Sequence, residues 1–247
     1  MRKLLIFFFI FFGCCSVMAQ KKTYHIDIRA KQTFGLNQWY DDPSVSSFLR
    51  KPSSTDLQIA FFKEIYKEWG AFFDLSVALF SYDKISDPLY SFSPLNMENY
   101  YIGWQFKQNE QAKLGTKLTI GVFRKFNVGK WEIIPALGYG VDEVNAPSFS
   151  YQLKEKDTNA MYIEEYNWLN TTGTEVKMFH VISAQVQSYY RIGKCRLNLG
   201  IEFRQFLNRA KFYSTTMDSY DNTIIRNDCL KGNLMNNLSV SVGVSMP

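Results

Sequence analysis

Residues 238–246 read LSVSVGVSM and alternate strictly between two kinds of side chain. Leucine, valine and methionine fall on one face of an extended chain, and serine and glycine fall on the other. Successive side chains of a β-strand point to opposite faces, so this stretch has one oily face and one small, polar face. It predicts a strand of a membrane β-barrel, apolar toward lipid and polar toward the lumen.

The same alternation recurs along the chain after residue 22. It predicts eight strands, at residues 23–35, 55–66, 71–82, 113–125, 130–143, 176–191, 195–207 and 237–246. Short glycine-containing links at 67–70, 127–130 and 192–195 join three pairs of them, which is a hairpin signal. Long polar segments join the others, at 36–54, 83–112, 144–175 and 208–236.

Short and long connections that alternate are typical of a transmembrane barrel with short periplasmic turns and long outer loops. We therefore predict an all-β fold, an antiparallel up-and-down transmembrane barrel that occupies residues 20–247 as a single domain. Two features complicate the pattern. Pro135 lies inside the fifth strand and cannot donate to the ladder, so we expect a bulge or a missing bond there. Residues 100–106 (YYIGWQF) resemble a strand, which either extends a hairpin above the membrane or raises the count to ten.

The N-terminus has the layout of a cleavable secretory signal. Arg2 and Lys3 precede the apolar run LLIFFFIFF at 4–12, and short side chains lead to Ala19, which predicts cleavage of residues 1–19. A membrane anchor and a lipoprotein signal ending at Cys14 or Cys15 are the alternatives. The formal net charge of +5 falls to +3 without Arg2 and Lys3. A net charge this small does not indicate a nucleic-acid partner.

The interior of the predicted barrel carries both signs of charge. The side chains expected to face the lumen are Asp27, Arg29, Lys31, Asp74, Lys113, Lys117, Glu132, Arg196, Glu202 and Arg204. Eight strands leave an interior just wide enough for side chains to fill. Because charges in such an interior need partners, we expect a paired network and no open channel.

The mature chain would keep two cysteines, Cys195 in a periplasmic turn and Cys229 in the last outer loop. A bilayer would hold them about 25 Å or more apart, and a disulfide needs α-carbons within about 7 Å. We therefore predict no intramolecular disulfide between them.

Catalytic and metal signals are sparse in the sequence. The two histidines are His25, expected on the periplasmic surface, and His180, expected near the outer end of its strand. A spacing of three places His180 and Ser183 on opposite faces of a strand, which is unsuitable for a catalytic pair. The histidines and cysteines lie in four separate elements, so we predict no metal site and no cofactor.

The outer loops are rich in aromatic residues. We expect a candidate binding surface at Trp39, Tyr40, Tyr101, Trp104, Tyr166 and Trp168. Exposed tyrosine and tryptophan can anchor a partner, and they can equally pack loops together or lie at the lipopolysaccharide interface.

The signal ending in Ala19 and Gln20, the eight alternating segments, and the links in VGKWEI (128–133) and IGKCRLNLGI (192–201) resemble the small outer-membrane β-barrel proteins. The resemblance is to OmpA/OmpX-like and porin-family barrels of the Bacteroidetes type, and it covers nearly all of the mature chain. It implies an outer-membrane location. The final residues, Ser245, Met246 and Pro247, depart from the aromatic end that is usual in that family.

These observations favour a non-enzymatic barrel with a filled, charge-paired lumen that displays loops for binding, adhesion or envelope integrity. The alternatives are an outer-membrane enzyme acting on lipid A or phospholipid acyl chains, a porin-like channel for small solutes, and a soluble periplasmic ligand carrier. We expect contact with outer-membrane lipid and lipopolysaccharide, an unknown extracellular ligand or protein, and a monomeric state.

Overall fold

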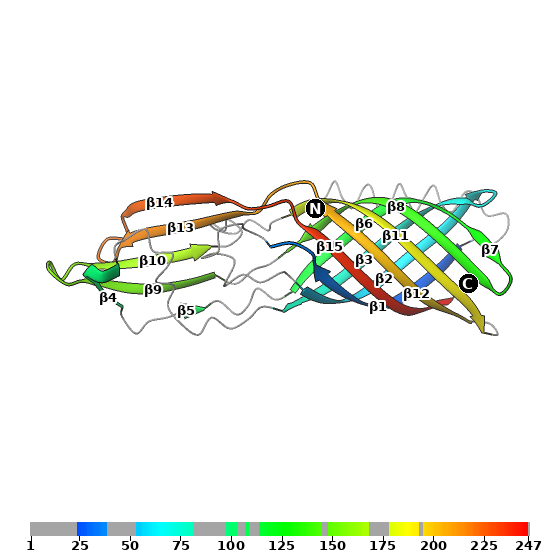
Figure 1. Cartoon of the computed structure of the whole chain (residues 1–247), viewed down its shortest axis with the longest axis horizontal. Coiled ribbons are helices and arrows are strands. Elements are labelled where there is room, and N and C mark those ends of the chain that lie inside the picture. The colour runs from blue at the N-terminus through cyan, green and yellow to red at the C-terminus, as the bar shows by residue number, and fades with distance from the viewer. Residues whose placement is uncertain are drawn as a thin grey trace.

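Eight antiparallel strands close into a barrel (Figure 1). The computed structural model describes residues 24–38, 53–81, 97–102, 107–108, 114–144, 148–167, 178–192 and 195–246. The barrel strands are β1 (Tyr24–Gly35), β2 (Ser53–Tyr66), β3 (Trp69–Ser81), β6 (Leu114–Arg124), β8 (Trp131–Glu143), β11 (Met178–Ile192), β12 (Cys195–Phe206) and β15 (Asn236–Met246). Each pairs with its neighbours in the order β11-β12-β15-β1-β2-β3-β6-β8, and β8 pairs back with β11.

Burial follows the period of two that the sequence predicts. In β2 and β11, buried and exposed side chains alternate along most of the strand. The exposed side is aliphatic around the middle of the barrel, as at Leu57 and Ile201. Exposed aromatic side chains such as Trp69 and Trp131 lie near the short turns. An apolar band flanked by aromatic residues is the surface that a barrel presents to lipid.

All eight predicted strands are confirmed, with bounds that differ by at most two residues from those expected. The short links at 67–70 and 127–130 are also found, although glycine does not shape both of them, and the third link, between the paired Ile192 and Cys195, has residues 193 and 194 outside the described residues. In the link between β2 and β3, Lys67 has a φ of 51° and Gly70 already belongs to β3. In the link that leads into β8, Gly129 itself takes a φ of 63°.

The ladder is interrupted at Pro135, as expected. Pairing of β6 with β8 stops at Phe123–Ala136. It resumes in the same register between β7 (Phe126–Val128) and β8, from Phe126–Ile133 onward. Arg124 therefore stands opposite Pro135 by register, and the interruption lies there because proline has no N–H to donate.

A second sheet projects from the long-loop end of the barrel (Figure 1). Its strands are β4 (Tyr100–Ile102), β5 (Lys107–Gln108), β9 (Ser148–Glu155), β10 (Met161–Asn167), β13 (Lys211–Asp218) and β14 (Ile224–Lys231). The order is β14-β13-β10-β9-β4, and β5 also pairs with β9. Residues 100–102 of the strand expected at 100–106 thus join this sheet as β4 and are not part of the barrel, whereas residues 103–106 lie outside the described residues. The other five strands of the sheet were not predicted.

Helical structure is limited in the described part of the chain to the single 3-10 turn η1 (Met97–Asn99). Within the same residues, no helix has the length and apolar character that a membrane span requires.

The two cysteines lie at opposite ends of the molecule. Cys195 begins β12 at the short-turn end, and Cys229 lies in β14 of the projecting sheet. Both are exposed and free, as expected from the predicted lack of an intramolecular disulfide between them.

These thiols allow a direct test of which end faces outward. A membrane-impermeant maleimide added to intact cells should label Cys229 and leave Cys195 unmodified, because short turns of such barrels face the periplasm. After the outer membrane is permeabilised, both should react. The single variants Cys229→Ser and Cys195→Ser identify each product by mass. Labelling of Cys195 in intact cells would reverse the proposed orientation.

Candidate functional site

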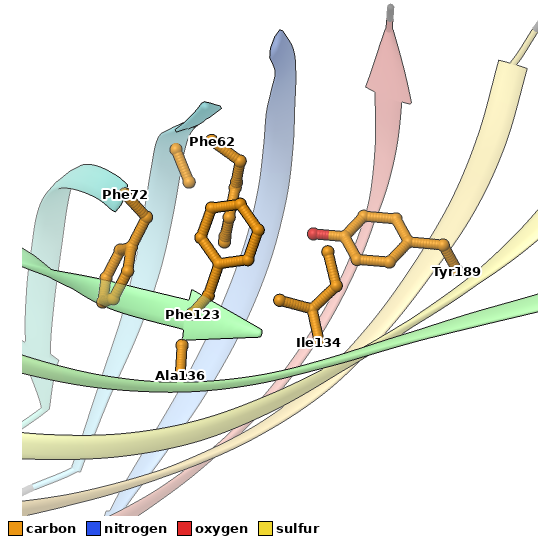
Figure 2. Close-up of a cluster of buried hydrophobic side chains, with 7 residues drawn as sticks. Phe62, Phe72, Phe123, Ile134, Ala136 and Tyr189 are labelled. Carbon is orange, nitrogen blue, oxygen red and sulfur yellow. The ribbon is translucent and has the colours of Figure 1, made fainter. Parts of the chain in front are cut away.

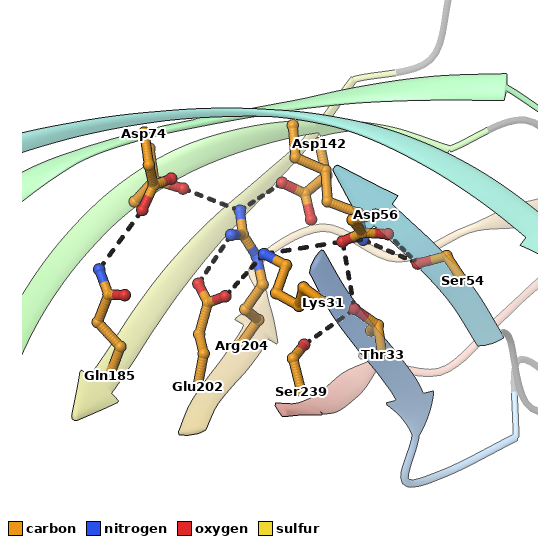
Figure 3. A network of polar contacts seen from close by, with 12 residues as sticks. Lys31, Thr33, Ser54, Asp56, Asp74, Asp142, Gln185, Glu202, Arg204 and Ser239 are labelled. Atoms are coloured by element: carbon orange, nitrogen blue, oxygen red, sulfur yellow. Dashed lines mark hydrogen bonds and ion pairs between the residues drawn. The ribbon is translucent and has the colours of Figure 1, made fainter. Parts of the chain in front are cut away.

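An ion network fills the lumen toward the long-loop end (Figure 3). Arg204 stands at its centre, and its Nη1 donates to Glu202 Oε1 at 2.8 Å. Its Nη2 donates to Asp142 and to Thr119 Oγ1, the latter at 3.1 Å. These four side chains come from β12, β8 and β6, so the network ties strands across the lumen. Arg204 and Asp142 are each at most 1% exposed.

Lys31 connects this centre to a second carboxylate. Its Nζ lies 2.9 Å from Glu202 Oε2 and 3.7 Å from Asp56 Oδ2. Lys117 Nζ donates to the same Asp56 oxygen at 2.7 Å. Both lysines and both carboxylates are almost fully buried, so these ion pairs are shielded from water. Removing one partner of such a pair lowers the free energy of unfolding far more than at a surface, because it leaves an unpaired buried charge.

A separate polar cluster lies nearer the short turns. Arg29 pairs with Asp27, and Tyr189 Oη donates to Asp27 Oδ2 at 2.7 Å. The ring of His25 stacks on Phe62 with centroids 4.9 Å apart, and its Nε2 lies 3.8 Å from Asp27 Oδ1. The expectation that His25 is a surface residue is therefore wrong. It shares the inward parity of Asp27 and Arg29, which buries it.

Apolar side chains occupy the lumen toward the short-turn end and are here called the apolar plug (Figure 2). Its members are Ala60, Phe62, Phe72, Phe123, Ile134, Ala136 and Tyr189. Phe62 contacts Phe72 and Phe123 with ring centroids 5.6 and 5.4 Å apart. The lumen therefore has two parts, an ionic part toward the long loops and an aromatic part toward the short turns.

The predicted lumen charges are found in three situations. Those inside the barrel are Asp27, Arg29, Lys31, Asp74, Lys117, Glu202 and Arg204. Glu132 and Arg196 pair with each other at 3.0 Å at the short-turn rim, with side chains 17% and 21% exposed. Lys113 lies outside the described residues. Asp74 accepts from Gln185 Nε2 at 3.4 Å.

Two central carboxylates, Asp56 and Asp142, are absent from the predicted set. A signal for them existed, because Asp56 continues the inward series of Ser54 and Gln58, and Asp142 continues that of Glu132 and Ala136. Each lies close to a strand end, where the alternating pattern gives way to a polar loop and is easily read as solvent-exposed.

The residues expected to form a loop binding surface are only partly described. Tyr101 lies in β4 with its side chain 59% exposed, and Lys156 Nζ stands 5.2 Å from the centre of its ring. Tyr166 contributes backbone to β10. Trp39, Tyr40, Trp104 and Trp168 lie outside the described residues.

Pairing in the projecting sheet places Tyr101 in a row of exposed side chains at its far end. Lys154 pairs with both Tyr101 and Met161. The N–H of Ser219 donates to the carbonyl of Met161, which brings the β13–β14 turn and the 98% exposed Tyr220 alongside. Tyr101, Lys154, Met161 and Tyr220 are here called the tip row.

The other face of the sheet is buried. Leu153 and Glu164 are each 0% exposed. Next to them, Tyr100 and Tyr162 meet edge to face with ring centroids 5.9 Å apart. Burial and the neighbouring Glu155 raise the pKa of Tyr100, so its hydroxyl stays protonated at neutral pH. The sheet therefore has one packed face and one exposed face, as a folded structure does and a set of independent loops does not.

Groups with catalytic potential are not brought together among the described residues. His180 is exposed and contacts the hydroxyl of Tyr139, whereas Ser183 is buried in the lumen. The two therefore point to opposite faces of β11, as predicted. In the same residues, no cluster of three His, Cys, Asp or Glu side chains could hold a metal ion.

The centre of the ion network should dominate the stability of the barrel. Arg204→Met removes the partner of two buried carboxylates and should lower the free energy of unfolding by about 3–5 kcal/mol. Arg124→Gln, which breaks the exposed 3.5 Å pair with Glu68, should cost less than about 1 kcal/mol. Urea titrations of both variants in detergent, followed by the gel shift between folded and heated forms, measure the difference. Equal costs would contradict a structural role for the network.

No protein-family model matches the sequence, and no curated protein matches it. Solved structures with a similar course of the chain include Neisserial surface protein A, with 9% identity and a TM-score of 0.44 over 91% of this chain and 97% of that one. A major outer membrane protein from Thermus thermophilus has 10% identity and a TM-score of 0.41 over 91% and 99%. The attachment invasion locus protein Ail of Yersinia pestis has 8% identity and a TM-score of 0.40 over 92% and 99%. In its own geometry, this chain is an eight-stranded antiparallel closed barrel with the architecture of a small outer-membrane β-barrel, as the sequence predicts.

Proposed function

We propose that this chain is a non-enzymatic outer-membrane barrel that holds a surface-exposed sheet, and that the exposed face of this sheet binds a protein outside the cell. The observation that carries the proposal is the projecting sheet itself. Its strands come from three of the four long connections, and they pair with one another beyond the barrel. A paired sheet presents side chains in fixed positions, which lowers the entropy cost of binding.

The composition of the tip row supports a protein partner. Tyrosine and methionine are enriched at the centres of protein interfaces. Tyr101, Met161 and Tyr220 are 59%, 41% and 98% exposed at one end of the sheet. An exposed cation, Lys154, separates Tyr101 from Met161 and provides a polar contact within the same row.

The filled lumen supports an anchoring role over transport. The apolar plug lies toward one end of the lumen, and the ion network lies toward the other. The separation of His180 from Ser183 likewise gives no support to an acyl hydrolase. We further propose export through a cleavable signal at 1–19, contact with lipopolysaccharide around the outer rim, and a monomeric barrel.

Binding should depend on the tip row and not on the barrel. Cells that produce the triple variant Tyr101→Ser, Met161→Ser, Tyr220→Ser should adhere to immobilised serum and matrix proteins about tenfold less than cells with the natural chain. The control is Tyr66→Ser, which removes a 65% exposed tyrosine at the opposite end. Surface amounts are equalised by Cys229 labelling. Equal adhesion of the triple variant and the natural chain, or none by either, would reject the proposed binding surface.

The barrel should not conduct. Planar bilayers that contain the purified chain should show no stable conductance steps of porin size, because the plug and the ion network occupy the lumen. The variant Phe62→Ala, Phe123→Ala removes two plug rings and serves as the comparison. Stable conductance by the natural chain would favour the channel alternative.

A further inference from the structure

The outer surface of the barrel has a groove that runs through the interrupted ladder. It has a volume of about 550 Å³. Its outward-facing lining includes Trp69, Val122, Arg124, Phe126, Pro135, Leu137, Ala184, Val186, Ile201 and Phe203. Apart from Arg124, these side chains are apolar. The groove therefore pairs one cation with a long hydrocarbon wall.

Strand register explains its course. Trp69 of β3 pairs with Arg124 of β6, and Pro135 of β8 lies opposite Arg124 by register. Across the next two strands, Pro135 pairs with Val186 of β11, and Val186 pairs with Ile201 of β12. The barrel strands run obliquely to the long axis (Figure 1). A row of paired residues that crosses these strands therefore moves away from the short-turn end, from Trp69 beside a short turn to the middle of β12.

Side-chain size explains its depth. The lining includes two small outward-facing residues, Pro135 and Ala184, which we take as the floor of the groove. Larger neighbours flank them, since Ala184 pairs with Leu137 on one side and with Phe203 on the other. An alternation of small and large side chains on a lipid-facing surface leaves a hollow at the small residues, where an acyl chain can lie.

The cation lies at the short-turn end of the groove. The guanidinium of Arg124 stands 4.8 Å from the ring centre of Phe126 and 5.6 Å from that of Trp69. Its partner Glu68 is at 3.5 Å, with side chains 44% and 52% exposed, and Lys125 pairs with Glu64 nearby. Aromatic side chains of this kind mark the headgroup level of a bilayer. Arg124 therefore has N–H donors at the depth of lipid phosphates, and its ring neighbours orient it there.

We infer that this groove binds one glycerophospholipid of the leaflet nearest the short turns, with the phosphate on Arg124 and an acyl chain along the floor at Pro135 and Ala184. Guanidinium groups bind phosphate through paired, charge-assisted hydrogen bonds. The inference rests on the membrane location of the barrel, and it adds a defined lipid site to the general lipid contact expected of any barrel. A groove with a long apolar lining and a single cation at one end suits an amphiphile, which has an acyl chain, better than it suits a free phosphate ion.

The test compares two lipids that differ only in the phosphate headgroup. The full chain, extracted in mild detergent, is titrated with dioleoylphosphatidylglycerol or dioleoylglycerol, and native mass spectrometry counts the bound molecules. The natural chain should bind one phosphatidylglycerol about tenfold more tightly than dioleoylglycerol, the ratio given by one charged contact of about 1.4 kcal/mol. Arg124→Gln should abolish that ratio, and Arg191→Gln, at an exposed arginine of the same end, should keep it.

A second variant tests the acyl groove independently of the charge. Ala184→Phe fills the floor and should weaken binding of both lipids about tenfold. Ala30→Phe makes the same change at a lipid-facing alanine of β1 and should have no effect. The heat-dependent gel shift checks that each variant is folded. Equal binding by the natural chain and Arg124→Gln, equal losses in the two phenylalanine variants, or selective retention of lipopolysaccharide would overturn the inference.

Fractionation separates failure of this site from failure of the proposed function. A chain absent from membranes refutes the proposed function, whereas a membrane-bound chain without lipid preference refutes only this site.

Discussion

Closure of the backbone ladder is the constraint on which the rest of this structure depends. Lipid offers no partner for N–H and C=O groups, so a sheet can cross a bilayer only without edges. The pairing of β8 with β11 removes both edges. Once the barrel is closed, the period of two assigns each side chain to lipid or to lumen. The projecting sheet still has edge strands, β4 and β14, which is compatible with a position in water and not with one in hydrocarbon.

Side chains must then fill the closed lumen, and both their size and their charge determine where they lie. The largest fully buried side chains are Arg29, Arg204, Tyr189, Phe62, Phe72 and Phe123. Glycines paired with two of them on the adjacent strands give them room. A Cβ on Gly121 would lie 2.5 Å from Cε1 of Phe72, and one on Gly243 would lie 2.8 Å from Cγ of Arg29. These positions tolerate no larger residue, so the bulky interior and the glycine pattern of the strands depend on each other.

The barrel was predictable because each of its strands carries a complete local pattern. The strands and the separation of His180 from Ser183 follow from the period of two, and the gap at Pro135 follows from the missing N–H of proline. The same counting places His25 inward, and only its closeness to the strand start suggested otherwise. The projecting sheet was not predictable in this way. Its strands, such as YQLKE within β9 and YSTTMD within β13, carry polar residues on both faces, and their pairing is set by how the barrel brings their ends together.

The two ends of the barrel therefore meet different physical demands. At the long-loop end, the cations Arg204 and Lys117 are paired with the carboxylates Asp142 and Asp56, so charged side chains can fill the space there. At the short-turn end, the turns hold neighbouring strands together, and the plug around Phe62 needs no charge to fill the space. Pro135 lies just above that end. An interrupted ladder is tolerable there because headgroups and water are near enough to satisfy the freed carbonyl of the opposite strand, which they could not do at the middle of the bilayer.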